Sequence, residues 1–377
     1  MSFYEDAKNF IENLPYKEEP YKSRNWGHAW HSLCSYHGKL KPAIAHFLVK
    51  NFSLPGEVVL DPLCGVGTIP FEACLQGRIG VGNDLSKMAY VVTKAKTEKV
   101  SQNEAYAALD RLDQYIKANK ANAFECTLPY SDFGFNGKLP DYFHRETYRE
   151  IITARNYFIS KGEEISSAEA MIMACLLHVL HGNRPYALSR KSHPLTPYAP
   201  TGEFEYKELV KHVKDKIDLS YKKAIWKDYT PGKALLGDFY DIPSKIEGAD
   251  VIICSPPFVD SLRFYINNWM RLWFVGWEPQ DYINAELSFL EGRQKKNMDV
   301  YILFFEMCYH VLKPNGRMVL HLGKSKKCDM ASELSDRAQR YFYEIYRGSE
   351  NVQNVERHGI KDKGGTTEHQ YLFLQKR

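Results

Sequence analysis

The chain has 377 residues, of which 44% are hydrophobic and 25% are charged, and its formal net charge is +4 at pH 7. These values are typical of a globular protein, and the length fits one core domain with an insertion. So small a positive charge excludes a surface that is basic all round. A nucleic-acid partner would therefore have to meet a local basic patch.

The sequence also indicates the compartment of the protein. No run of 18 apolar residues occurs, and the first residues lack the basic and then apolar pattern of a secretory signal. The eight cysteines form no CxxC pair, and several of them lie in apolar runs. We therefore expect reduced thiols and a cytoplasmic protein without a membrane segment.

The segment before the first predicted strand is polar and rich in aromatic residues, and it ends in a helix predicted over 43–51. His28, His31, Cys34 and His37 recur here at every third position. This spacing matches no usual zinc motif, and on a helix the four side chains would spread around the axis. We predict no metal site and interpret the segment as a surface that can face nucleic acid. The alternative is a zinc site.

A glycine-rich motif follows the first predicted strand. The apolar residues 58–60 lead into Asp61-Pro62-Leu63-Cys64-Gly65-Val66-Gly67-Thr68. The two glycines let the backbone approach a ligand closely, because glycine has no Cβ and tolerates positive φ. The helix predicted over 68–76 can present its first N–H groups to a carboxylate. No Lys-Ser or Lys-Thr pair follows the glycines, so this is not a phosphate loop.

An acidic residue ends the second predicted strand. The apolar run 79–82 leads into Asn83-Asp84, and Asp84 lies 17 residues after Gly67. At this place in a strand–loop–helix–strand unit, a carboxylate binds the hydroxyls of a ribose. The order of elements therefore predicts a nucleoside-binding site. The alternative is an ordinary βαβ unit that binds another dinucleotide or nothing.

Residues 101–230 separate this unit from the rest of the predicted sheet and are mainly helical. Apolar periodicity predicts helices over 101–120, 141–159 and 166–181. Between 181 and 198, basic, hydroxyl and aromatic residues alternate on a proline-rich backbone. Arg184, Arg190 and Lys191 of this loop are candidates for phosphate contacts. The alternative is a solvated connection.

A second special loop ends the predicted strand over 249–254. Its residues are Ser255-Pro256-Pro257-Phe258. Two prolines fix φ and remove two backbone donors, which leaves carbonyls free to accept hydrogen bonds. Phe258 offers a flat face for stacking, an interaction worth about 1–3 kcal/mol with a base. The alternative is a rigid turn after a buried strand.

The last third of the chain predicts the remainder of a sheet. Before the special loop, a strand is expected over 234–238. After it, the aromatic residues of 262–277 have the helical spacing of a core segment. A helix over 300–312, a turn over 313–316 and a strand over 317–322 follow, with Lys324 at the strand end. Strands over 341–345 and 370–375 should form an antiparallel hairpin with the loop 359–369.

The glycine motif and the Ser-Pro-Pro-Phe motif together resemble those of nucleic-acid amino-methyltransferases that use S-adenosyl-L-methionine. Serine in the first position is similar to the DNA cytosine-N4 methyltransferases, which carry Ser-Pro-Pro and then Tyr or Phe. The resemblance covers roughly 36–100 and 231–377. It implies an α/β fold of the Rossmann-like class I type, with a mostly parallel seven-stranded sheet and a largely helical insertion.

The resemblance implies three segments. Residues 1–100 would hold the N-terminal segment and the cofactor-binding half, 101–230 the insertion for target recognition, and 231–377 the catalytic half. Ser255, Pro256, Pro257 and Phe258 would form the catalytic loop, and Arg184, Arg190, Lys191 and Lys324 would bind nucleic acid. The residues expected to bind the cofactor are Tyr36, Asp61, Cys64, Gly65, Gly67, Thr68, Asp84, Leu85, Asp238 and Phe239.

The activity implied is methylation of the N4 amine of cytosine in double-stranded DNA, with the target base flipped out of the stack. A companion restriction endonuclease is a partner that this resemblance allows. Three alternatives stay open: the same transfer to RNA cytidine, adenine-N6 methylation, and an inactive protein that only binds nucleic acid. The intact pair of motifs argues against the last.

Overall fold

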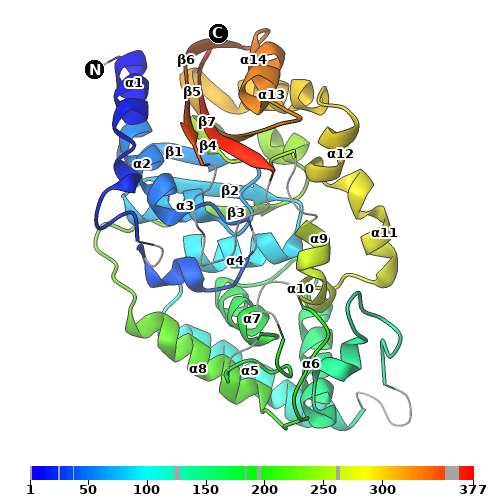
Figure 1. Ribbon diagram of the computed structural model, residues 1–377. Helices are drawn as coiled ribbons and strands as arrows, with labels where there is room; N and C mark the ends of the chain where they lie inside the picture. Colours follow the sequence, from blue (N-terminus) through cyan, green and yellow to red (C-terminus); the bar gives the residue numbers. More distant parts are fainter. Residues whose placement is uncertain are drawn as a thin grey trace.

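The computed structural model describes residues 2–23, 26–36, 38–122, 128–182, 185–192, 197–259, 264–352 and 365–377. Its centre is a seven-stranded sheet in the order β3-β2-β1-β4-β5-β7-β6 (Figure 1). Neighbouring strands from β3 to β5 run parallel, and β7 runs antiparallel to both β5 and β6. The strands are β1 (Val58–Asp61), β2 (Ile79–Asp84), β3 (Lys233–Leu236), β4 (Ala249–Cys254), β5 (Leu312–Ser325), β6 (Phe342–Asn351) and β7 (Thr366–Lys376). This is the mostly parallel seven-stranded sheet that the family resemblance implied.

Helices surround the sheet and continue into a further layer. The α-helices are α1 (Phe3–Asn13), α2 (Pro42–Phe52), α3 (Thr68–Leu75), α4 (Lys87–Thr97), α5 (Gln102–Asn119), α6 (Arg145–Ser160), α7 (Ser167–Val179), α8 (Leu209–Lys222), α9 (Phe264–Asn267), α10 (Trp269–Phe274), α11 (Pro279–Ser288), α12 (Leu290–Lys296), α13 (Val300–Val311) and α14 (Met330–Ala338). Short 3-10 helices include η1 (Pro15–Lys17) and η5 (Phe239–Ser244).

The two faces of the sheet are buried against different helices. Val59, Ile253 and Val319 lie in the core formed with α1 and α2, whereas their neighbours in sequence, Leu60 and Leu320, lie in the core formed with α13 and α14. This alternation follows from the two-residue period of a strand. Apolar residues on both faces are expected where helices cover a parallel sheet on both sides.

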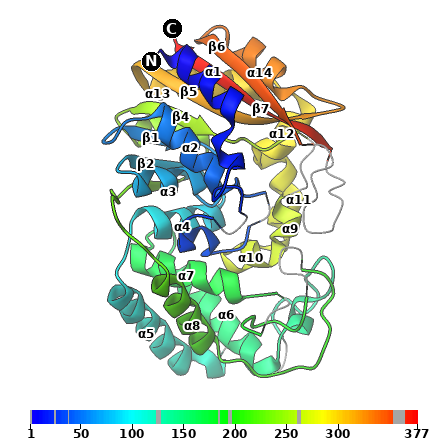
Figure 2. The ribbon, with the colours of Figure 1, turned by 60° about the vertical axis from the view of Figure 1, so that its left-hand side comes forward.

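The segment 101–230, which was expected to be an insertion, is mainly helical and shares its core with the layer that carries the sheet. Figure 2 shows α5–α8 as a layer on the side of α4 that faces away from the sheet. Buried residues of α4, of α5–α8 and of α10 form one continuous hydrophobic cluster. The aromatic residues Trp269, Trp273 and Phe274 belong to this cluster, as the spacing predicted. The insertion is therefore packed onto the sheet layer through α4 rather than joined by a linker.

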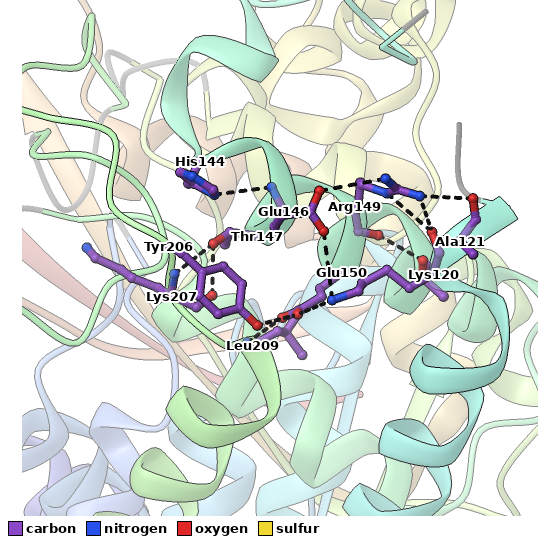
Figure 3. Close-up of polar contacts among 11 residues, drawn as sticks. Lys120, Ala121, His144, Glu146, Thr147, Arg149, Glu150, Tyr206, Lys207 and Leu209 are labelled. Carbon is purple, nitrogen blue, oxygen red and sulfur yellow. Dashed lines mark hydrogen bonds and ion pairs between the residues drawn. The ribbon is translucent and has the colours of Figure 1, made fainter. Parts of the chain in front are cut away.

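Buried Glu150 of α6 holds the chain that leads into α8 (Figure 3). One carboxylate oxygen accepts the Leu209 amide at 2.8 Å, and the other accepts the Tyr206 hydroxyl at 2.8 Å and the Lys120 ammonium at 3.1 Å. Thr147 lies three residues before Glu150 on α6. Its hydroxyl donates to the Lys207 carbonyl and accepts the Lys207 amide. These contacts satisfy the first orphan donor of α8 and fix the end of the long loop before it.

Two expectations about the C-terminal strands were wrong in their boundaries. The turn expected over 313–316 lies inside β5, which already pairs with β4 at Leu312 and continues at Arg317 after a register shift. Asn315 takes φ 61° in this irregular part. Residues 366–369 were expected in a loop, but they form the start of β7, because β5 and β6 offer them backbone partners on both sides.

Within the described ranges, no helix combines the length and the apolar character needed to cross a membrane. The same ranges hold no group of three or more His, Cys, Asp or Glu side chains placed to bind a metal ion. His31, which the sequence placed in a third-position pattern, instead lies 2.6 Å from the buried Glu72 carboxylate. His37 of that pattern lies outside the described residues.

Candidate active site

The sheet order brings both sequence motifs to one edge. The neighbouring strands β2, β1 and β4 run parallel, so their carboxyl ends lie side by side. Asp84 ends β2, the glycine loop (residues 61–68) follows β1, and Ser255 follows β4. In open α/β sheets this edge is where ligands bind. Asp84 and Ser255 are more than 170 residues apart in the sequence (255 − 84), and both lie at this edge of the sheet.

Asp61, the last residue of β1, is buried and accepts the Leu63 amide at 3.2 Å. Burial raises the pKa of this carboxyl to about 7, and the nearby Asp84 adds to the rise, while hydrogen bonds from the Cys254 thiol and from Leu63 oppose it. A carboxyl with this pKa changes its charge near neutral pH. A positively charged ligand bound at this edge of the sheet would therefore favour the ionised form of Asp61.

The glycine loop takes a conformation that other residues would disfavour. Gly65 and Gly67 have φ of 50° and 68°. A Cβ on Gly67 would lie 2.6 Å from the Thr93 hydroxyl oxygen, and a Cβ on Gly65 would touch the Tyr36 ring at 3.5 Å. The loop leads into α3, whose first residue, Thr68, is buried. Glycine is thus required at 67 by backbone angle and by space together.

Asp84 holds the glycine loop from the neighbouring strand. Its Oδ2 accepts the Gly65 amide at 2.9 Å, and its Oδ1 accepts the Ser86 amide at 2.9 Å. Burial raises the pKa of Asp84 to about 6, against the lowering effect of these two hydrogen bonds. A carboxylate has about four acceptor positions, so both oxygens keep capacity for ribose hydroxyls. Leu85, which follows, is partly exposed.

Two residues that sequence reasoning missed also support this loop. Lys96 of α4 is fully buried and donates to the Val66 carbonyl at 2.6 Å. Burial lowers its pKa to about 7, and the Lys39 charge contributes. The buried amide of Asn83 donates to the carbonyls of Pro62 and Gly237. An Asn directly before the acid was a signal that could have indicated Asn83, whereas no helix was predicted around Lys96.

Tyr36, which the resemblance implied as a cofactor-binding residue, lies beside the glycine loop. Its ring packs beside Gly65 and lies 5.7 Å from the Phe264 ring. Burial raises the pKa of the Tyr36 phenol well above its ordinary value, and the charge of Asp84 adds to this effect. The phenol therefore remains a neutral hydrogen-bonding group beside the glycine loop and Asp84.

Asp238 and Phe239 follow β3 on the other side of β2. The Asp238 carboxylate caps η5 through the Tyr240 amide and lies 3.6 Å from the Arg293 guanidinium. Gly237 donates its amide to the Asp84 carbonyl at 3.1 Å, which joins the two strand ends. The Phe239 side chain is buried against Phe304, so it belongs to the core and only its backbone is available to a ligand.

The Ser-Pro-Pro-Phe loop has a fixed set of partners. The Ser255 hydroxyl oxygen lies 3.0 Å from Nδ1 of His321, a β5 residue that sequence reasoning missed. The Pro257 carbonyl accepts the Gln294 amide at 2.9 Å. Among the described residues, none donates a hydrogen bond to the Pro256 carbonyl. Phe258 lies directly over Gly323, where an added Cβ would come within 2.5 Å of its ring.

The predicted nucleic-acid contacts differ in their surroundings. Arg190 donates to the carbonyls of Gly202 and Asp141, and its guanidinium lies 4.2 Å from the centre of the Phe204 ring. It therefore fastens its own loop, with two of its five N–H groups left over. Lys191 is exposed. Lys324 pairs with Asp329 at 3.1 Å and with Glu368 at 3.7 Å. Arg184 lies outside the described residues.

Residues 30–176 match the protein family described as UPF0020: RMKL-like, methyltransferase domain. This range contains Tyr36, the glycine loop and Asp84. No curated protein matches the chain in sequence.

Several solved structures are similar to the chain at low sequence identity. TrmN from Thermus thermophilus has a TM-score of 0.35 and 13% identity, with 90% of this chain and 50% of that chain covered. The present chain thus spans about half of that protein. The rRNA methyltransferase aviRa from Streptomyces viridochromogenes has a TM-score of 0.34 and 10% identity, covering 95% and 94%. A putative rRNA-methylase from Clostridium thermocellum has a TM-score of 0.32 and 8% identity, covering 89% and 96%.

The residues at this edge fit S-adenosyl-L-methionine. Gly65 and Gly67 leave the backbone open to close approach, and Asp84 retains acceptor capacity for ribose hydroxyls. The buried Oδ1 of Asn83 has no hydrogen-bond partner among the described residues, which is the kind of group that a bound ligand satisfies. Once bound, the cofactor would supply a methyl group on a positively charged sulfur. Residues 30–176 are thus similar to a methyltransferase domain, whose cofactor is S-adenosyl-L-methionine.

Proposed function

We propose that the protein transfers the methyl group of S-adenosyl-L-methionine to the N4 amine of cytosine in DNA. The target base would leave the duplex and enter the pocket formed by the Ser-Pro-Pro-Phe loop, because its amine cannot reach an enzyme group while it is stacked. The observation that carries this proposal is the position of Ser255. It follows β4 directly beside the glycine loop after β1, so an amine held there would face the methyl donor.

The chemistry needs alignment more than a strong base. The lone pair of an exocyclic amine is delocalised into the ring, so the amine is a poor nucleophile. If the Ser255 oxygen and the Pro256 carbonyl accept its two N–H groups, the nitrogen becomes pyramidal and its lone pair turns toward the methyl group. Phe258 would stack on the base, and its own position is fixed by Gly323 beneath it. Catalysis then comes mainly from orientation.

The charge at the edge supports the same chemistry. The buried Asp61 and the half-buried Asp84 both favour a positively charged ligand when they are ionised. The interaction with the sulfonium is lost as it becomes a neutral thioether. Because these groups bind charge rather than transfer protons, they serve cofactor binding, and the reacting amine is left to the Ser-Pro-Pro-Phe loop.

The test identifies the modified nucleoside. The protein would be incubated with methyl-labelled cofactor and, separately, with duplex DNA and with structured RNA, and the nucleic acid would then be digested to nucleosides. We expect label in N4-methyldeoxycytidine from DNA. Label only in RNA nucleosides would replace the DNA substrate, and label in N6-methyladenine would replace the base. Absence of label from every nucleoside, with cofactor binding intact, would overturn the proposal. A companion endonuclease belongs to the same proposal and would be tested separately, by whether methylation by this protein protects DNA from cleavage by that endonuclease.

A further inference from the structure

A row of polar side chains crosses the sheet next to Ser255. In the parallel pair β4–β5, Cys254 lies opposite Leu320, so the following residues, Ser255 and His321, are neighbours. In the antiparallel pair β5–β7, His321 lies opposite Tyr371. Ser255 and His321 share the face that α1 and α2 cover, since the side chains of Ile253, Val319 and Tyr371 lie in that core.

The row continues through β7 to β6, which is the outermost strand on that side of the sheet. The rings of His321 and His369 lie 4.9 Å apart, and the His369 Nδ1 lies 3.4 Å from the buried carboxylate of Glu350 on β6. That carboxylate also accepts the Tyr16 hydroxyl and lies 2.5 Å from the Lys17 ammonium. Burial tends to raise the pKa of Glu350, but the neighbouring His369, Lys17 and Tyr16 side chains lower it to about 2. A permanent negative charge therefore lies behind the two histidines.

His321 itself is buried and neutral. Burial lowers its pKa well below the ordinary value, His369 lowers it further, and Glu350 opposes the change. Its Nδ1 faces Ser255, and its Nε2 has no hydrogen-bond partner among the described residues. The remaining groups that face it are the rings of Phe258, His369 and Tyr371. A buried neutral imidazole beside a reactive-site hydroxyl has one nitrogen available as a proton acceptor.

We propose that His321 is a positioning residue for Ser255 that also takes the proton released by the methylated amine. This inference rests on the proposed function. In the resting protein the Ser255 hydroxyl donates to Nδ1 of His321, which leaves the lone pairs of Oγ for the target amine. During transfer, the nitrogen–carbon bond forms as the sulfur–methyl bond breaks, and that bond's electron pair stays on sulfur. One amine proton then passes to Oγ as the hydroxyl proton passes to Nδ1.

A weak base is sufficient for this role. An exocyclic amine that has just gained a methyl group carries a positive charge and is a strong acid, so a histidine of low basicity can deprotonate it. The same low basicity keeps His321 in its accepting form at neutral pH. The negative charge of Glu350 favours the imidazolium once it forms, because it lies behind His369 on the same face.

Two substitutions separate this role from simple support of the loop. His321→Asn places an amide near the position of Nδ1, so it can keep a hydrogen bond to Ser255 but cannot accept a proton. His310→Asn makes the same change at an exposed histidine of α13 and is the matched control. We expect single-turnover methyl transfer at saturating cofactor to fall about 10²-fold for His321→Asn and to stay unchanged for His310→Asn.

The pH profile and the tautomer supply independent readouts. The wild-type transfer rate should fall at acid pH as His321 becomes protonated, and His321→Asn should lose this dependence. In the wild-type protein without cofactor, nitrogen NMR of the imidazole should find the proton on Nε2 and not on Nδ1, which tests the arrangement even if the variant fails to fold. A proton on Nδ1, or a wild-type rate for His321→Asn, would overturn the inference while methylation by the wild type keeps the proposed function. If the wild type methylates no nucleobase amine, the proposed function fails, and the inference fails with it.

Discussion

The carboxylate of Asp84 accepts the backbone amide of Gly65 at 2.9 Å. The acidic residue at the end of β2 therefore supports the glycine loop, and in the proposed function its carboxylate would also accept hydrogen bonds from a ribose. One substitution at this position should disturb both functions, because the Gly65 amide and the ribose hydroxyls would bind the same carboxylate.

We predict that Asp84→Ala weakens the binding of S-adenosyl-L-methionine by about 1–3 kcal/mol, since it leaves the Gly65 amide and the ligand hydroxyls without an acceptor. Titration calorimetry on the folded variant measures this difference. Asp110→Ala, at an exposed acid of α5, is the control. Equal affinities for the wild type and Asp84→Ala would remove Asp84 from the cofactor site.

Cofactor affinity should also depend on pH. The pKa values of Asp84 and Asp61 are raised by burial to about 6 and about 7, so both carboxyls lose their charge as pH falls through this range. A sulfonium cation favours the ionised forms, so affinity should rise with pH. We expect about a tenfold rise between about pH 5.5 and pH 8, which corresponds to a fall of one pH unit in one carboxyl pKa on binding.

The stability of the free protein should respond in the opposite sense. Because these folded-state pKa values exceed the ordinary value of 3.8, each carboxyl contributes stability below that value that is lost as pH rises through about 6 and 7.

Two controls test the pH dependence of cofactor binding. Asp61→Asn should flatten the binding profile, and S-adenosylhomocysteine, which has no charge on sulfur, should show a weaker pH dependence. A cofactor affinity that is constant over this pH range would contradict the assignment.

Gly67→Ala tests the close packing of the glycine loop. The added Cβ would meet Thr93 at 2.6 Å in a backbone with positive φ. Gly56→Ala is a matched control, because Gly56 also has positive φ but no atom lies within 4 Å of its Cβ position. We expect Gly56→Ala to lower the free energy of unfolding by about 1–2 kcal/mol with normal cofactor affinity. Gly67→Ala should lower it further and abolish measurable cofactor binding. Normal cofactor binding by Gly67→Ala would show that the loop can accommodate a Cβ at this position.

Lys191 should contribute to nucleic-acid affinity through phosphate. Lys191→Ala should lower the slope of log affinity against log salt by about 1, because one phosphate contact and its counterion release are lost. Arg190→Ala should also lower the thermal stability, since Arg190 ties Gly202 and Asp141 to its loop. Lys50→Ala, on α2, is the control for an exposed lysine. If Lys191→Ala leaves the salt-dependence slope unchanged, the loop that contains Lys191 is only a structural connection.

The sequence predicted the parts of this site whose signals are local. The order of strand, Gly65, Gly67, helix, strand and Asp84 lies within about 30 residues, and a βαβ unit has few arrangements. The strand before Ser255 could be predicted in the same way, because its apolar run is short and ends at two prolines. The family resemblance then implied the mostly parallel seven-stranded sheet that joins the two halves, but not the order of its strands.

Contacts set by register between distant strands could not be predicted. His321 reaches Ser255 only because β5 pairs with β4 with Leu320 opposite Cys254, and a shift of one residue would turn His321 to the other face. In the sequence it is one polar residue in an apolar strand. Lys96 was missed for a related reason: only the packing of α4 against the glycine loop explains a buried lysine. The partners of Arg190 are the carbonyls of Gly202 and of the distant Asp141, and the irregular backbone of its loop follows no periodic pattern.

Ser255→Ala in single-turnover methyl transfer tests the central claim most directly. The variant removes the acceptor for the target amine but keeps both prolines and Phe258, so we expect normal folding and nearly normal binding of cofactor and nucleic acid. The transfer rate should fall by about 10²-fold or more, equal to about 2.7 kcal/mol of transition-state stabilisation. Ser255→Asp should recover little activity with cytosine, because it adds bulk and charge, and Ser288→Ala at an exposed serine of α11 should leave the rate unchanged. A wild-type rate for Ser255→Ala on a verified substrate would contradict the account and leave the Ser-Pro-Pro-Phe loop as a rigid turn.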